Sequence, residues 1–221
     1  MNQSATITVD YALLQKKGND SLESKLDSLA YSGVQRLRIV SVFVTNGFEC
    51  KAMKSRVRAF SSRFKKISFT KPVLSGKTRI YSFAKLLISH AYFDPNEKTI
   101  LVGHGLPLSK NAEYKTLERK LHKLGTKNAR VVLLKGRGTV QDFLFDLDKS
   151  GGRKNWPRVR VVPLFINCGH HVKHDIFGAA DSESTSHGKS LCQILEENGI
   201  AIEKSITSLG EQAWFKDFVN E

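Results

Sequence analysis

The stretch Val159-Arg-Val-Val-Pro-Leu-Phe-Ile-Asn-Cys-Gly-His-His-Val-Lys-His-Asp175 decides the fold that the sequence predicts. Its first part is an apolar run rich in β-branched residues, which is typical of a buried strand. The run stops at Asn167-Cys-Gly169, and His170 and His171 follow at once. A strand ending in such a turn would leave one of the two histidines at the C-terminal edge of a sheet, where ligand sites of open α/β proteins collect.

A second stretch, Thr99-Ile-Leu-Val-Gly-His104-Gly105, repeats this pattern of apolar strand, glycine and histidine. We expect the two strand ends to face one site, because parallel strands deliver their C-terminal ends to the same edge of a sheet. Imidazole is a borderline ligand that suits Co, Ni, Fe and Zn ions. We therefore predict that His104 and His171 share a site that handles a metal ion and leaves several coordination positions open for exchange.

Each histidine also has a simpler interpretation, as a turn residue whose ring bonds a backbone carbonyl, and a lone motif match favours it. Because two glycine-flanked histidines follow two buried strands, the metal-site interpretation and the turn interpretation are about equally favoured. Helical spacing would put His170 or His171 beside His174. Cys168, next to this cluster, is interpreted as a small buried residue rather than a ligand.

Strands alternate with helices along the chain, which favours a parallel sheet covered on both faces. We predict an α/β fold of two pseudo-repeated halves, residues 1–96 and 97–221, each a mainly parallel sheet flanked by helices, with the histidines in the second half. Besides the opening stretch, strands are predicted at 38–44, 67–74, 99–102, 130–134 and 201–202, and helices at 21–33, 48–61, 78–90, 111–124, 139–147, 187–198 and 211–219. A strand at 5–9 is a weak further candidate.

Composition sets the class of protein. The chain has 221 residues, of which 40% are hydrophobic, and this is enough for one large domain or two small ones with a real core. No apolar run approaches the roughly 20 residues of a membrane-spanning helix, and we expect no signal peptide. The three cysteines are widely spaced and odd in number, so a cytoplasmic location without disulfides fits best.

The charge is strongly positive, at +14, and eleven Lys or Arg residues but no Asp or Glu lie between Lys51 and Lys85. Such a run is either a solvated face or a surface that attracts nucleic acid, phosphate, anionic lipid or a polycarboxylate small molecule. Nucleic acid is disfavoured, because the sequence lacks the aromatic-interleaved motifs of single-strand readers. A homo-oligomer is left open.

Four short motifs in order resemble the anaerobic, class II sirohydrochlorin cobaltochelatases. The opening stretch is similar to the family's block of Pro-Leu, apolar residues, Ala-Gly-Asp-His, two residues and Asn-Asp. Leu101-Val-Gly-His-Gly105 resembles a second signature, and Ser208-Leu-Gly-Glu211 resembles Gly-Leu-Gly-Glu near the C-terminus. Val44-Thr-Asn-Gly-Phe-Glu49 is similar to a Gly-x-Glu segment of the first half. The resemblance covers roughly residues 10 to 220.

The resemblance implies a lyase that inserts a divalent metal into sirohydrochlorin, as in anaerobic cobalamin biosynthesis. It implies two α/β halves with a cleft between them. His104 and His171 would hold the metal and act catalytically, with His104 accepting protons from the pyrrole nitrogens. Gly47, Glu49 and His170 would contact the substrate. The metal is a substrate, Co2+ first with Ni2+ or Fe2+ as alternatives, and no organic cofactor is implied.

The sequence departs from the family pattern at several positions. Lys135-Gly-Arg137 follows the strand at 130–134, where the family has a glutamate, and these two cations would grip a carboxylate of the acidic tetrapyrrole. His170 replaces an aspartate, the segment Ala180–Lys189 is lengthened, and the family's first strand and helix have no clear counterpart. An alternative function is therefore a chelatase-like protein that binds metal or tetrapyrrole without turnover.

Overall fold

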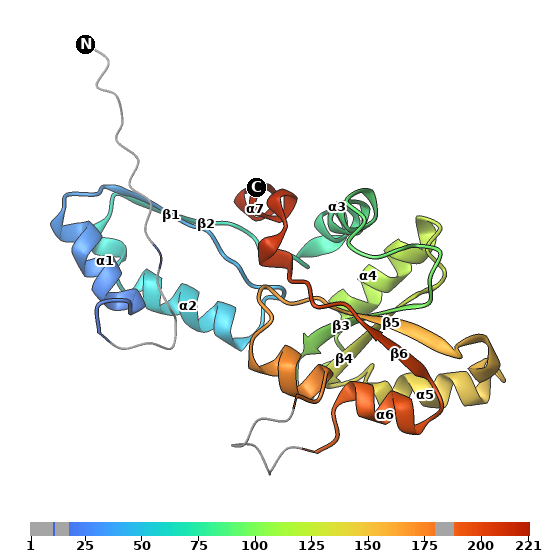
Figure 1. Cartoon of the computed structure of the whole chain (residues 1–221). Coiled ribbons are helices and arrows are strands. Elements are labelled where there is room, and N and C mark those ends of the chain that lie inside the picture. The colour runs from blue at the N-terminus through green and yellow to red at the C-terminus, as the bar shows by residue number, and fades with distance from the viewer. Residues whose placement is uncertain (1–10, 12–17, 180–187) are drawn as a thin grey trace. The chain divides into compact units, whose positions relative to one another are not determined.

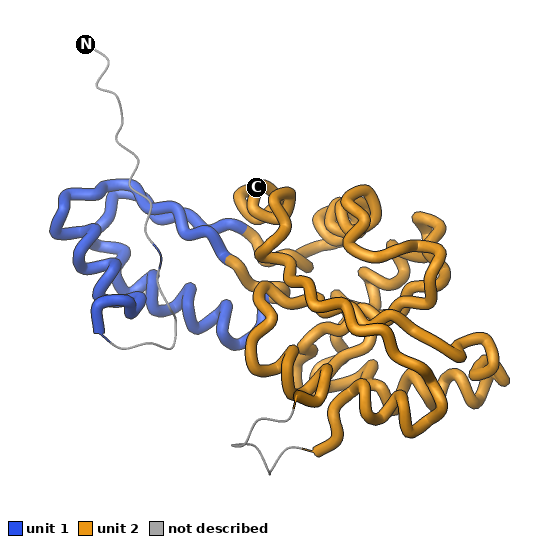
Figure 2. Tube along the Cα trace, viewed as in Figure 1, with its two compact units in different colours: residues 1–41, 46–70 blue, residues 42–45, 71–221 orange. Residues whose placement is uncertain are grey.

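The computed structural model describes residue 11, residues 18–179 and residues 188–221 (Figure 1). The strand considered at 5–9, and residues 180–187 of the lengthened segment, lie outside these ranges. The chain divides into two compact units, residues 1–41 with 46–70 (unit 1) and residues 42–45 with 71–221 (unit 2) (Figure 2). Each unit holds a parallel sheet flanked by helices, which confirms the predicted fold class.

Unit 1 is built on a pair of parallel strands, β1 (Arg36–Ile39) and β2 (Lys66–Phe69), and on helices α1 (Leu22–Tyr31) and α2 (Phe48–Arg58). Ser21 caps α1, because its hydroxyl accepts a hydrogen bond from the Ser24 amide at 3.2 Å. The helices are joined by a two-pronged ion pair between Glu23 and Arg56, and hydrogen bonds from this guanidinium lower the pKa of the Glu23 carboxyl.

The strand predicted at 38–44 is shorter in the structure because its ladder is interrupted. The amide of Ser41 donates to the Thr70 hydroxyl at 2.8 Å instead of to a backbone carbonyl. Pro72, two residues further on, has no amide hydrogen to give. Pairing resumes where Val73 and Leu74 donate to the carbonyls of Phe43 and Val44. The apolar pattern was therefore correct, but side chains and a proline divide the pairing into two pieces.

Unit 2 contains a four-stranded parallel sheet in the order β4-β3-β5-β6. Its strands are β3 (Thr99–Gly105), β4 (Ala129–Lys135), β5 (Arg158–Pro163) and β6 (Ala201–Lys204). Its helices are α3 (Gly76–Ser89), α4 (Ala112–Lys123), α5 (Val140–Lys149), α6 (Leu191–Glu197) and α7 (Ala213–Asn220). Short helical turns occur at Ser61–Arg63 in unit 1 and at Arg153–Asn155, His171–Ile176 and Leu209–Glu211 in unit 2.

The sheet of unit 2 is buried on both faces, because alternate residues of its strands point into two separate cores. Leu101 and Val162 join the core formed with α3, α4 and α7. Ile100, Val102 and Val161 join the core formed with α5 and α6. The five helices thus cover both faces, in the three-layer arrangement that continuous apolar strands predict (Figure 1).

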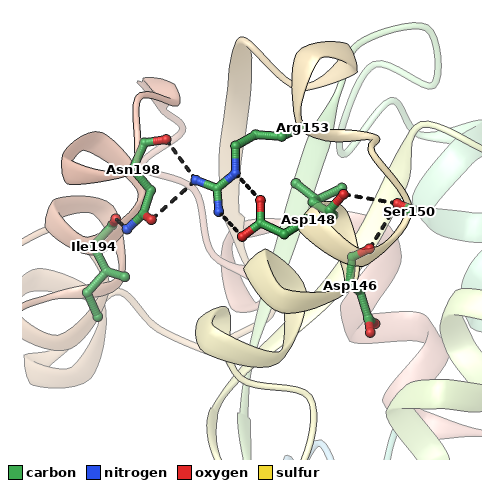
Figure 3. Close-up of polar contacts among 7 residues, drawn as sticks. Asp146, Asp148, Ser150, Arg153, Ile194 and Asn198 are labelled. Carbon is green, nitrogen blue, oxygen red and sulfur yellow. Dashed lines mark hydrogen bonds and ion pairs between the residues drawn. The ribbon is translucent and has the colours of Figure 1, made fainter.

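Arg153 joins three parts of unit 2 near the start of β5 (Figure 3). Its guanidinium donates to both carboxylate oxygens of Asp148, at 2.6 and 2.7 Å, and this pairing lowers the pKa of Asp148. It also donates to the backbone and side-chain oxygens of Asn198 at the end of α6. The end of α5 and the end of α6 are therefore tied to the turn that enters β5.

The observed elements match the predicted ones to within a few residues, apart from β1 and β2 and from a turn after β5 that the sequence did not reveal. Helix α3 belongs by its contacts to unit 2, so the chain passes from unit 1 to unit 2 for the last time after residue 70. The functional division at residue 96 stays a prediction. Within the described ranges, no helix is both long and apolar enough to cross a membrane.

The side chain of Asn111 links the chain segments that leave β3 and β4 by hydrogen bonds. Its side-chain oxygen accepts from the Leu106 amide at 2.9 Å, and its amide nitrogen donates to the carbonyls of Lys135 and Arg137 at 3.1 and 3.3 Å. The residue is buried and has a left-handed backbone, with φ of 49°. Asparagine tolerates this conformation better than most residues do, so both its backbone and its side chain suit the position.

We expect Asn111→Ala to lower the free energy of unfolding by about 2 kcal/mol or more, because three buried hydrogen bonds are lost and alanine is strained at this φ. Chemical denaturation followed by tryptophan fluorescence measures the change, since Trp156 and Trp214 both lie in unit 2. Asn96→Ala is the matched control at an exposed asparagine before β3 and should cost about 0.5 kcal/mol or less. Equal effects of the two changes would contradict the role of Asn111.

Candidate metal-handling site

The strand order of unit 2 creates a site at the C-terminal ends of β3 and β5. These two strands are neighbours, with Val102 aligned with Pro163. The chain leaves β3 toward α4 on one face of the sheet and leaves β5 toward α6 on the other face. In open α/β sheets, ligands usually bind where the chain leaves neighbouring strands toward opposite faces in this way. His104 and His171 belong to these two exits.

His104 lies at the end of β3 between two glycines that the backbone packing requires. A Cβ at Gly103 would overlap the ring of Tyr114. Gly105 has φ of 71°, and a Cβ there would overlap the Lys135 carbonyl oxygen on the neighbouring strand. These contacts fix the backbone on both sides of His104, whose side chain remains partly exposed at the sheet edge.

The His104 ring is oriented by a backbone carbonyl. Its Nδ1 lies 2.9 Å from the oxygen of Gly105, and since a carbonyl only accepts, Nδ1 carries the proton in this bond. The lone pair of the neutral imidazole is then on Nε2. The edge of the ring also meets Phe165, with 6.3 Å between ring centroids.

His171 opens a π-helical turn, η3 (His171–Ile176), and is oriented by a carboxylate. Its Nδ1 lies 2.6 Å from Oδ2 of Asp175, four residues further along the turn. In the neutral ring, this contact places the proton on Nδ1 and the lone pair on Nε2, and a carboxylate partner makes the imidazole a stronger ligand. The turn itself is held by Lys204 at the end of β6, whose ammonium donates to the Phe177 carbonyl at 2.9 Å.

The structure brings the rings of His104 and His171 together, with 4.8 Å between their centroids and 67° between their planes. Two imidazoles at this separation can share an ion at the usual metal–nitrogen distance of about 2.0–2.1 Å. Among the residues that the structure describes, no group of three or more His, Cys, Asp or Glu is arranged to hold a metal.

The other two histidines of the cluster form a second pair. His170 lies beside His174, with 4.3 Å between ring centroids and 35° between planes. The sequence left open whether His170 or His171 would be the neighbour, and the structure selects His170. The rings of His170 and His171 are 6.0 Å apart by centroids.

Lys135 is the last residue of β4, which pairs with β3 on the side away from β5, and Arg137 lies on the loop that follows. Lys135 is aligned with Gly105, and both cationic side chains are exposed. They therefore end the strand adjacent to the one that carries His104. Their assignment as carboxylate-binding residues stays a prediction.

The Ser208–Glu211 motif holds the segment that follows β5 in place. Glu211 accepts from the Ser208 amide and hydroxyl, each at 2.8 Å, and these bonds lower the pKa of its carboxyl. The amides of Leu209 and Gly210 donate to the carbonyls of Phe165 and Ile166. A Cβ at Gly210 would come within 2.5 Å of the Ile166 oxygen. The motif thus holds the chain that leaves β5 toward the histidines.

Cys168 does not suit a ligand role, since burial and the nearby Glu211 raise the pKa of its thiol and disfavour the thiolate. Gly47 and Glu49 lie in unit 1, at the N-cap and in the first turn of α2. Glu49 is exposed there, at the helix end that favours acidic side chains. The part of these two residues in substrate binding stays a prediction.

Sequence reasoning missed Asn111 as a positioning residue. Its one visible signal is an asparagine directly before an amphipathic helix, which usually marks an N-cap. The side chain makes no cap hydrogen bond and instead bridges the two loops.

We expect Asp175→Asn to weaken Co2+ binding by about 10- to 100-fold, the usual loss when the partner of a metal-ligating histidine is changed. The substitution keeps the shape of the side chain but removes the charge beside Nδ1 of His171. Calorimetric titration with CoCl2 measures the affinity, and Asp146→Asn on the exposed face of α5 is the matched control. An unchanged affinity in Asp175→Asn would show that the contact does not tune a ligand.

A family model described as cobalt chelatase (CbiK) matches residues 11–220 of the chain. The match runs through both units and includes both strand ends that carry the paired histidines. It also includes the Ser208–Glu211 motif. The chain belongs to the cobalt chelatase (CbiK) family.

Proposed function

We propose that this protein inserts Co2+ into sirohydrochlorin, with His104 and His171 as the residues that hold and release the metal. Family membership implies metal insertion into a tetrapyrrole, with a divalent metal as a substrate. The observation that carries the proposal is the 4.8 Å separation of the two rings at the edge of the sheet. Both rings direct Nδ1 to an acceptor within their own exit segment, so both lone pairs are on Nε2.

Metal insertion exchanges two kinds of bond. The ion loses its bonds to imidazole and water and gains bonds to the pyrrole nitrogens, while two pyrrole N–H protons are released. An imidazole that gives up the metal regains a lone pair on Nε2 and can accept one of these protons, while the other passes to water. His104 is the proposed acceptor. Neutral imidazoles suit this exchange better than thiolates, which hold such ions more firmly.

The substrate carries many carboxylates, and the protein offers cations to match. The net charge of +14 favours an anionic ligand. Lys135, at the end of β4, and Arg137, on the loop that follows, are both exposed and are proposed to bind substrate carboxylates, together with His170. The same charge would slow the approach of a free metal ion, so the imidazole pair must supply the attraction for the metal.

A second candidate is a protein that binds metal or tetrapyrrole without turnover. It is favoured by Lys135, which stands at the end of β4 in alignment with Gly105. An ammonium group near the metal position repels a divalent cation. The resemblance places a glutamate there, and a carboxylate would instead help to bind the ion.

We expect His104→Ala and His171→Ala each to lower the rate of Co2+ insertion into sirohydrochlorin by about 100-fold or more, since each removes a metal ligand and, for His104, a proton acceptor. The absorption change of the tetrapyrrole measures the rate. His122→Ala is the control, because its ring bonds the carbonyl of Ala129 at the start of β4, far along the strand from the exits. Unchanged rates in both site variants would remove the proposal.

We expect Lys135→Glu to raise the affinity for Co2+ by about tenfold, because a repulsive charge becomes an attractive one. The same titration and rate assay apply, with Lys127→Glu as the control for an equal change of net charge at the other end of β4. The second candidate would be selected if the wild type binds sirohydrochlorin without inserting the metal and the Lys135→Glu variant does insert it. A loss of substrate binding in this variant would instead support the role of Lys135 in gripping carboxylates.

A further inference from the structure

Leu108 is the most exposed large apolar residue that the structure describes, and it lies four residues after His104. It belongs to the segment that leaves β3 at the edge of the sheet where the candidate site lies. An exposed leucine alone is ordinary on a protein surface. At this position, however, the backbone conformation also disfavours leucine.

The backbone of Leu108 is left-handed, with φ of 55°. The residue is the second central residue of a turn that the Ser109 amide closes by donating to the Leu106 carbonyl at 3.2 Å, and Pro107 is the first. A positive φ directly after the proline is typical of a type II turn, which favours glycine or asparagine there. Leucine is unfavourable at this φ, because its Cβ crowds the following carbonyl oxygen. Neither burial nor backbone conformation accounts for the leucine, which points to contact with a ligand.

The turn is tied to the end of β4 and the loop after it, which carry the exposed cations Lys135 and Arg137. The Arg137 amide donates to the Ser109 carbonyl at 3.4 Å. Gly136 lies so close to the start of the turn that a Cβ there would be 2.3 Å from the Leu106 oxygen. The backbone that carries the exposed leucine is thus fixed against the backbone that carries the two cations.

An apolar side chain beside cations matches the two parts of a carboxylated tetrapyrrole. The faces of the macrocycle are apolar, whereas the carboxylates lie on side chains around its rim. We propose that Leu108 contacts the substrate by packing against a face of the tetrapyrrole, while Lys135 and Arg137 bind carboxylates at the rim. This contact removes the leucine from water, and the gain offsets the unfavourable backbone. The inference rests on the proposed function for the identity of the ligand, but not on turnover.

Titration of the full chain with sirohydrochlorin alone, without metal, followed by the absorption of the tetrapyrrole, tests this contact. We expect Leu108→Gly to weaken binding by about tenfold, the usual scale for losing part of the burial of one leucine. Its denaturation midpoint should stay the same or rise, because glycine suits the left-handed position. Leu108→Met keeps an apolar side chain and should bind within about threefold of the wild type.

Phe145→Ala is the matched control, since Phe145 is an exposed apolar residue on α5, and this variant should bind like the wild type. The difference between the wild type and Leu108→Gly should persist as the salt concentration rises, because an apolar contact is not screened. A difference that disappears at high salt would overturn the inference.

Equal affinities in the wild type and Leu108→Gly would overturn the inference, as would an equal loss in Phe145→Ala or a lowered denaturation midpoint in Leu108→Gly. A wild type that does not bind sirohydrochlorin would overturn it together with the proposed function. Binding without Co2+ insertion, with the tenfold loss in Leu108→Gly, would leave the inference standing and remove the proposed function. Insertion by the wild type with unchanged binding in Leu108→Gly would do the reverse.

Discussion

The change of direction between β3 and β5 is the constraint on which the candidate site depends. Because β4 lies on one side of β3 and β5 on the other, the chain leaves the two central strands toward opposite faces of the sheet. Residues 67 positions apart in the sequence can therefore meet at the edge between them. The ring contact between His104 and His171 is a direct result of this strand order.

Close backbone packing then holds the two exits in place. Gly105 lies against the carbonyl of Lys135, and Gly210 lies against that of Ile166, so a side chain at either glycine would push a histidine-bearing segment away. Asn111 adds hydrogen bonds across the first of these contacts. The histidine-bearing segments are thus held by packing and hydrogen bonds of other residues, and Gly105 and Gly210 belong to two of the motifs that resemble those of the family.

The sequence predicted the strands and the meeting of their ends, because buried parallel strands leave long apolar runs and a glycine at the exit. It predicted less where the determining contact is not periodic. The early end of β1 depends on a bond from Ser41 to the Thr70 hydroxyl, which no pattern along one strand reveals. The π-helical turn, beside which His170 and His174 are neighbours, is tied to β6 by the bond from Lys204 to Phe177, and no pattern along the sequence indicates this contact. The left-handed backbone of Asn111 likewise follows from tertiary packing rather than from local propensity.

The carbonyl of Gly105 orients the ring of His104, the residue before it, and the carboxylate of Asp175 orients the ring of His171, four residues before it. All four residues belong to unit 2. No donor or acceptor from the bound partner is needed to aim either nitrogen. Such preorganisation permits a sequence of events in which the cation is lodged first and the macrocycle arrives second. The protein would then bind the tetrapyrrole with the metal already in place.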